Sequence, residues 1–508
     1  SIQINQMFQN AIIEDFPDGF FEGLDGVTNL AELFESAIFM KPLKGGMFKG
    51  LVKANQAYQT FYMSNVSELP ADLFEGMGTN ATSITFSKTF FGCKNLTEIP
   101  SGLLDPVASK LTSIANCFQN CTSLKSIPEG FGNSATMLTN VSNAFYGCTS
   151  LESLPSEMFR GASAKLNNCN SMFWGCSALK SVPDGLFSFI TARNASFSYC
   201  FANCSSLQKV GAEVFPTTVS STGLNNVFQF CTSLTDISAD VFAKCAAVTT
   251  MSYTFKGCTA LKTVPSGLFS KMIKVTNFDS IFYECTGLES VPEGLFAGNT
   301  AATKIVKAFY GCTALKSVPA GLLAKNVKLT DVNSLFYKCT SLETVPADLF
   351  SKNTLITTFN YLFEYCTGFK TIPAGLFAKN TKGCYFNDTF AGCTSLEAIP
   401  AGLFDAVPPA STVATFKECF INCTSLKSIP AGLFDKALKA GYFNYCFANC
   451  TGLTGESPYT MVSGNKIHLY ERKANYSLGG FNNRIAGTKC FSGCTGLSDY
   501  GSISSDWK

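Results

Sequence analysis

The segment Phe282-Tyr-Glu-Cys285-Thr-Gly-Leu-Glu-Ser-Val-Pro-Glu-Gly-Leu-Phe296 is one copy of a pattern that returns along most of the chain. Its consensus, Phe-x-x-Cys-Thr-x-Leu-x-x-Val/Ile-Pro-x-Gly-Leu-Phe, recurs from Cys93 to Cys450. The cysteines of successive copies are 27 or 28 residues apart, except for one step of 30 and a last step of 44 to Cys494. Self-similarity at such a period is typical of solenoids, in which each repeat forms one coil.

Apolar residues within one copy show why the coils must stack. Around Cys339 they recur mostly at intervals of three or four from Leu329 to Phe350. This spacing suits neither a half-exposed strand nor a long helix, and it favours short straight segments joined by corners. A single coil cannot bury these residues, so stability must come from the interfaces between neighbouring coils. We therefore expect a repeat solenoid of the mainly β or α/β class.

The repeat predicts columns of identical side chains inside the solenoid. The expected ladder residues include Phe282, Phe309, Phe336, Cys258, Cys285, Cys312, Cys339 and Cys366. A buried free cysteine behaves as a small apolar residue, so the cysteine column is interpreted as structural. Disulfides between neighbouring coils are the alternative, because parallel strands lie about 4.8 Å apart and the bond tolerates Cα separations of that size.

The corners of each coil are also predicted by the repeat. The residue before the ladder cysteine is Gly or Asn in 11 of 15 copies, which indicates a left-handed turn. Pro follows the Val or Ile of most copies and should end a short strand there. Gly211 and Ser238 replace this Pro, and we expect irregular packing or a bend in those two coils.

Charge alternates from coil to coil at the residue after the repeat Leu. In consecutive copies this position runs Lys262, Glu289, Lys316, Glu343, Lys370, Glu397 and Lys427. Opposite charges on adjacent strands contribute roughly 0.2–1 kcal/mol each, whereas like charges are destabilising. The alternation therefore favours the correct register between coils.

The ends of the chain depart from the repeat. Residues 1–77 carry degraded copies and are predicted to form an N-terminal cap, residues 78–454 form the array, and residues 455–508 form an irregular C-terminal cap with one final copy. The chain starts at Ser1 without a charged and apolar leader, so we expect any export signal to be removed or to lie outside it. No apolar run of about 18 residues is present, so no transmembrane segment is expected.

Composition excludes some classes of partner. The 508 residues include 38 basic and 36 acidic ones, which gives a net charge of +2. Such a balance predicts no overall field that attracts nucleic acid or an anionic membrane.

The repeats resemble the BspA-like leucine-rich-repeat surface proteins of Bacteroides and related anaerobes. The resemblance rests on Phe-x-Gly-Cys-Thr-Ser-Leu-x-x-Val/Ile-Pro and covers residues 78–454 and the last copy. It implies a right-handed leucine-rich-repeat solenoid of about 27-residue coils, with a parallel β-sheet along one face and short helical, 3-10 or irregular segments along the other. It further implies an exported, often lipid-anchored protein on the bacterial outer membrane. The asparagine column typical of leucine-rich repeats is missing, and cysteine takes its place.

The residues that carry chemistry elsewhere give no catalytic pattern here. His468 is the only histidine and is interpreted as a surface residue. Cys-x-x-x-Cys pairs place their first cysteine at a position that is apolar in other copies, so they predict packing rather than metal binding. No phosphate-binding glycine loop is found. The sequence thus predicts no enzyme, no cofactor and no metal site.

The best candidate for a binding surface is aromatic. Tyr283, Tyr310 and Tyr337 follow the ladder Phe in three consecutive copies, and Tyr146 and Trp174 do so in two earlier ones. Stacked at about 5 Å per coil, they would form a strip that contacts sugar rings or anchors a protein partner. The alternative interpretation is that these rings only shield the Phe column.

Two functional hypotheses follow from the sequence and the resemblance. The first is a non-enzymatic cell-surface scaffold for recognition or adhesion that binds a protein or glycan. The alternative is an accessory surface lipoprotein of an outer-membrane complex for uptake of glycans or peptides. A persistent complex with a transporter would distinguish the second from the first.

Overall fold

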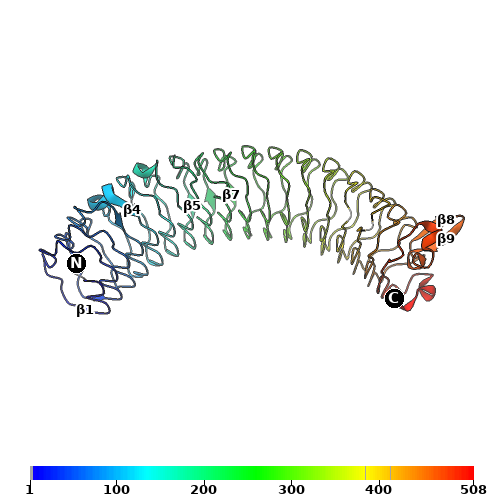
Figure 1. Cartoon of the computed structure of the whole chain (residues 1–508), viewed down its shortest axis with the longest axis horizontal. Helices are drawn as coiled ribbons and strands as arrows, with labels where there is room; N and C mark the ends of the chain where they lie inside the picture. The colour runs from blue at the N-terminus through cyan, green and yellow to red at the C-terminus, as the bar shows by residue number, and fades with distance from the viewer. Residues whose placement is uncertain (1–3, 384, 412) are drawn as a thin grey trace. The chain divides into compact units, whose positions relative to one another are not determined.

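The computed structural model describes residues 4–383, 385–411 and 413–508, and Figure 1 traces their backbone as successive coils. The chain divides into two compact units. The first unit is Ser1–Thr249 and the second is Thr250–Lys508. Each unit is an array of coils in which every coil packs on the next one along the chain. The boundary between the units falls inside the predicted array of residues 78–454, and the predicted caps at the two ends remain predictions.

The first unit contains short parallel strands. Strands β1 (Ile12–Ile13) and β2 (Ile38–Phe39) pair, as do β3 (Ile84–Thr85) and β4 (Leu111–Ser113), while β5 (Ser181–Val182), β6 (Lys209–Val210) and β7 (Asp236–Ile237) form a three-stranded sheet. Two 3-10 helices, η1 (Asp105–Lys110) and η2 (Arg160–Ala162), lie in its corners.

The second unit is built almost wholly of turns and single parallel bridges. Its bridges run from coil to coil through Thr250, Asn277, Lys304, Asp331, Thr358, Tyr385, Thr415, Tyr442 and Ala486. Regular elements appear near its C-terminal end: the antiparallel hairpin β8 (Tyr459–Val462) and β9 (Asn465–His468), the helix α1 (Tyr476–Gly479), and the 3-10 helices η3 (Leu469–Glu471), η4 (Tyr500–Ser502) and η5 (Ser505–Trp507).

The expected parallel sheet is thus reduced to small pieces in the described residues, and the backbone explains why. Ser280 and Glu284 have φ values of 56° and 57°, which interrupt an extended strand. Alternate N–H groups still bond to the next coil: those of Phe278, Ser280, Phe282 and Glu284 donate to the carbonyls of Lys304, Val306, Ala308 and Tyr310 at 2.6–3.1 Å. The groups between them fold back on their own coil, as Ile281 does to the Phe278 carbonyl at 3.3 Å.

The predicted left-handed turn before the ladder cysteine is confirmed. Positive φ occurs there at Gly92, Asn120 and Gly257, and also at the bulky Glu284 and Lys338. A second left-handed position, four residues earlier, was not predicted, because Ser, Tyr or Lys occupies it in most coils and Asn only at Asn116, Asn143 and Asn226.

The expected irregularity at Gly211 and Ser238 is wrong. These residues follow β6 and β7 of the only three-stranded sheet among the described residues. The N–H of Gly211 donates to the Val182 carbonyl at 2.9 Å, and that of Ser238 to the Val210 carbonyl at 3.0 Å. Proline has no N–H and cannot make these bonds, so its replacement extends the ladder rather than disturbing it.

The predicted Phe and Cys ladders lie in the core. In the second unit the rings of Phe282, Phe309 and Phe336 stack at 5.7–5.8 Å and within 8° of parallel, and all three are fully buried. The described cysteines are buried, Cys258 among them. The thiols of Cys285, Cys312, Cys339 and Cys366 are free and donate to the carbonyls of Phe255, Phe282, Phe309 and Phe336 at 2.9–3.2 Å. The disulfide alternative therefore fails for these four coils, and burial raises the pKa of the Cys285 thiol to about 12.

A column of buried asparagines, which the sequence analysis missed, crosses four coils of the second unit. Asn299, Asn326, Asn353 and Asn380 are 0–1% exposed. Each side-chain amide donates to two backbone carbonyls; for Asn353 these are Leu323 and Asn326, at 3.0 and 2.9 Å. The signal was present in the sequence as Asn three residues after the second Phe or Leu of the repeat, at a spacing of 27.

Ion pairs confirm the charge alternation at some of its positions. Lys262 lies 3.7 Å from Glu289 and Lys370 lies 3.1 Å from Glu343, from nitrogen to oxygen. Because these side chains are largely exposed, each pair contributes little stability and serves mainly to favour register.

Candidate functional site: a tyrosine-rich face on the second unit

Tyr283, Tyr310 and Tyr337 form a continuous stack, here called the tyrosine strip. The ring centroids of Tyr283 and Tyr310 are 4.4 Å apart at 7°, and those of Tyr310 and Tyr337 are 4.3 Å apart at 8°. The stack arises because the residue after the ladder Phe takes the same place in every coil. The three rings are half-buried.

The ends of the tyrosine strip are covered by other side chains. The Lys256 ammonium lies 4.9 Å from the Tyr283 centroid, a cation–π contact, and the Tyr365 ring meets Tyr337 edge-on at 5.7 Å. The ring faces are thus occupied by one another, and the strip presents ring edges and hydroxyls to a partner. Burial raises the pKa of Tyr283 to about 12, so its hydroxyl stays protonated at neutral pH and can donate a hydrogen bond.

More tyrosines are exposed in the coils that follow the strip. Tyr361, Tyr365, Tyr385 and Tyr442 are 37–55% exposed. Together with the tyrosine strip they define the tyrosine-rich face of the second unit. Sequence analysis missed these four because they lie at the bridge and left-handed positions, where residue type varies from coil to coil.

In the first unit the same column holds shorter aromatic stacks. Tyr146 and Trp174 stack at 4.3 Å and 10°, as their spacing predicted. Tyr62 and Phe91 form a second pair at 4.7 Å and 14°, which the sequence analysis did not single out. Gln119 takes the same position between the two pairs in the sequence, so the first unit has no three-ring strip at these positions.

Two carboxyl groups beside the strip have raised pKa values. Glu364 follows Tyr337 in the same column and is 9% exposed, and Asp388 in the next coil is 8% exposed. Burial, reinforced by the negative charges of Asp388 and Glu418, raises the pKa of Glu364 to about 8, and burial together with Glu418 raises that of Asp388 to about 7. This edge of the face therefore changes charge near neutral pH.

Replacing Glu364 by Gln should stabilise the protein more at pH 8 than at pH 5. The folded state keeps a proton that the unfolded state releases between about pH 4.5 and pH 8, so stability falls as pH rises through that window. Chemical denaturation at several pH values measures the difference from the wild-type midpoint. Glu152→Gln is the control of opposite sign, since a hydrogen bond from Lys180 lowers the pKa of Glu152. An equal gain for Glu364→Gln at both pH values would contradict the assignment.

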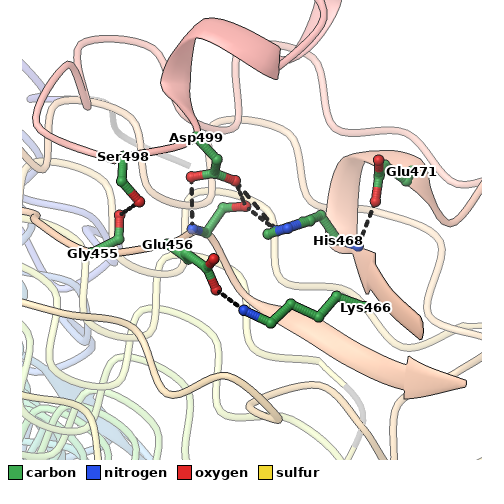
Figure 2. A network of polar contacts seen from close by, with 8 residues as sticks. Gly455, Glu456, Lys466, His468, Glu471, Ser498 and Asp499 are labelled. Carbon is green, nitrogen blue, oxygen red and sulfur yellow. Dashed lines mark hydrogen bonds and ion pairs between the residues drawn. The ribbon is translucent and has the colours of Figure 1, made fainter. Parts of the chain in front are cut away.

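The lone histidine lies in a polar network of the C-terminal segment, which Figure 2 shows. The His468 Nδ1 is 2.9 Å from the Ser457 Oγ and 3.3 Å from the Asp499 Oδ2, and the Ser457 hydroxyl also donates to Asp499. The His468 side chain is only 13% exposed, so its interpretation as a surface residue is wrong. The network ties the β8–β9 hairpin to the last repeat.

These three residue types also form catalytic triads, but this geometry differs from one. Ser457 is fully buried, which keeps substrate from its hydroxyl. In a triad the serine contacts Nε2 and the carboxylate contacts Nδ1, whereas here both contact Nδ1. The network therefore has a structural role: it holds Ser457 and His468 against Asp499.

A metal site needs several ligating side chains close together, and a membrane-spanning helix needs a long apolar run. The described residues contain no group of three or more His, Cys, Asp or Glu side chains placed to hold a metal ion. None of their helices is long and apolar enough to cross a membrane.

Coils of this kind, with stacked Phe and Leu columns and side-chain ladders to backbone carbonyls, define a leucine-rich-repeat solenoid. The sequence profile of the BspA type leucine rich repeat region matches in 6 copies, over residues 84–186, 142–289, 197–318 and 279–454. The chain belongs to this family, whose repeats form scaffolds for protein interaction.

Solved structures similar to this chain include two bacterial leucine-rich-repeat proteins. A leucine-rich repeat protein from Bacteroides ovatus is 20% identical, with 80% of this chain and 86% of that chain covered and a TM-score of 0.44. A leucine rich cell surface protein from Faecalibacterium prausnitzii is 18% identical over 61% of this chain and 82% of that one, with a TM-score of 0.24. No curated protein matches the chain.

Proposed function

We propose that this chain is a non-enzymatic recognition scaffold of a bacterial cell surface and that the tyrosine-rich face of its second unit binds a protein or glycan partner. Family membership supports the scaffold, and the name of the Faecalibacterium neighbour supports the location. Attachment to the outer membrane is part of the same proposal.

The tyrosine strip is the observation that carries the proposal. Tyrosine gives a large, rigid contact area at low entropic cost and has a hydroxyl for hydrogen bonding, which makes it common at the energetic centre of interfaces. The exposed Tyr361, Tyr365, Tyr385 and Tyr442 extend this surface over further coils. A role limited to shielding the Phe column would not require these exposed rings.

Replacing Tyr283, Tyr310 and Tyr337 together by Ala should weaken partner binding at least about 30-fold, because loss of several central aromatic contacts commonly costs more than about 2 kcal/mol. Partners are found with an array of immobilised oligosaccharides and by co-purification from gently solubilised native membranes. A transporter recovered in stoichiometric amount would favour the accessory-subunit alternative.

Two controls separate binding from folding. Replacing the same three residues by Phe keeps the stack and removes only the hydroxyls, so any loss then measures hydrogen bonding. Replacing Tyr146 and Trp174 by Ala changes the matching column of the first unit and should leave binding unchanged. Unchanged binding by a folded Tyr283, Tyr310 and Tyr337 alanine variant would overturn the proposal.

A further inference from the structure

Five successive segments of the second unit lack acidic residues, and four of them carry lysine, the exception being residues 296–302. Residues 269–275, 296–302, 323–329, 350–356 and 377–383 contain seven lysines and no Asp or Glu. These lysines, here called the lysine ridge, are Lys271, Lys274, Lys325, Lys328, Lys352, Lys379 and Lys382. All seven are exposed.

The buried asparagine column fixes these segments in register. Lys325, Lys352 and Lys379 each precede a ladder asparagine. The Asn353 amide donates to the Asn326 carbonyl at 2.9 Å, and the Asn380 amide donates to the Asn353 carbonyl at the same distance. The three lysines therefore start from neighbouring positions in consecutive coils, where parallel segments lie about 4.8 Å apart.

The positive charges of the ridge are not neutralised within the protein. No ion pair is found for any of the seven in the described part of the chain, whereas Lys262 and Lys370 of the alternating column pair with Glu289 and Glu343. Like charges at this spacing repel each other. Opposite charges thus pair in the alternating column, whereas like charges are stacked in the lysine ridge. An external anionic surface would reduce the repulsion between the lysines of the ridge.

Exposed aliphatic side chains lie among the lysines. Ile273, Val327 and Leu355 are 57%, 49% and 36% exposed. The five segments contain no Arg, Tyr or Trp, and their Phe residues are buried. Groups that stack on sugars or bases, or bind phosphate with two parallel hydrogen bonds, are therefore missing from the ridge. Lysine mixed with aliphatic residues is instead typical of surfaces that lie on lipid.

We infer that the lysine ridge docks on the surface of an anionic phospholipid bilayer, with the ammonium groups on lipid phosphates and the aliphatic side chains at the headgroup boundary. This surface differs from the tyrosine-rich face and does not rest on the function proposed for it. It is compatible with the net charge of +2, because seven lysines gathered on one surface give a local excess that the total does not show.

Vesicle sedimentation with the full chain tests the inference. The protein should bind vesicles that contain phosphatidylglycerol and should not bind vesicles of phosphatidylcholine alone. Binding should fall steeply at about 1 M salt, where the screening length shrinks to about 3 Å. Replacing Lys325, Lys328, Lys379 and Lys382 by Gln should reduce partitioning roughly 1000-fold, given an attraction of about 1 kcal/mol per lysine at such a surface.

The matched control removes four lysines from the alternating column instead. Lys262, Lys316, Lys370 and Lys427 replaced by Gln gives the same net charge, and this variant should keep most of its binding. Equal loss in both variants would overturn the ridge as the site, since only total charge would then matter. Binding to heparin or duplex DNA without binding to phosphatidylglycerol vesicles would overturn the lipid as its partner.

Discussion

Phe309→Ala should destabilise the second unit by about 3–5 kcal/mol, as expected for a fully buried aromatic side chain cut to a methyl group. Phe309 is 0% exposed and packs between Phe282 and Phe336 at 5.8 and 5.7 Å. The substitution would leave a cavity in the middle of the Phe stack. The neighbouring coils pack through the same column, so they cannot move in to fill the cavity without losing their register. Guanidinium denaturation followed by circular dichroism measures the loss.

Tyr442→Ala is the control for Phe309→Ala. This aromatic residue lies in the same unit but is 55% exposed, so its removal should change stability by less than about 0.5 kcal/mol. A loss below about 1 kcal/mol for Phe309→Ala would mean that the Phe column contributes little to the cohesion of the coils.

Asn353→Ala should cost about 1–3 kcal/mol, because it removes two buried hydrogen bonds, to the carbonyls of Leu323 and Asn326, each of which keeps a backbone donor. The substitution also removes the Asn353 Oδ1, which is buried without a hydrogen-bond partner, and this offsets part of the loss. Asn353→Asp keeps the shape but exchanges the amide donor for a carboxyl group in the core, so we expect it to be at least as damaging. Denaturation midpoints of the two variants give the comparison.

The adjacent exposed Lys352→Ala is the control for the asparagine column, and its midpoint should match the wild type. If Asn353→Ala also matched the wild type, the two hydrogen bonds would make no net contribution, and the register of the lysine ridge would need another explanation.

The sequence predicted the parts of the fold that repeat. The spacing of the ladder cysteines predicted coils, and the Gly or Asn that precedes most of them predicted the left-handed turn, because these features depend on residue type at one position. It did not predict the asparagine column or the exposed Tyr361 and Tyr365. Asn occupies its position in only four described coils, and the two tyrosines interrupt positions that hold other residue types elsewhere.

The polar network of the C-terminal segment could not be predicted from the sequence. Ser457, His468 and Asp499 are separated by up to 42 residues and follow no period. Their contact depends on how β8 and β9 fold back on the last repeat.

The sequence by itself determined the class of fold, the ladders of Phe and Cys and the place of the tyrosine strip, since stacking copies of one pattern brings equal positions together. Only the tertiary structure decided that the strip rings cover one another's faces, that proline-free coils carry the best sheet, and that seven lysines form an unpaired ridge. These properties depend on distances between different positions of neighbouring coils, which repeat spacing alone leaves undefined.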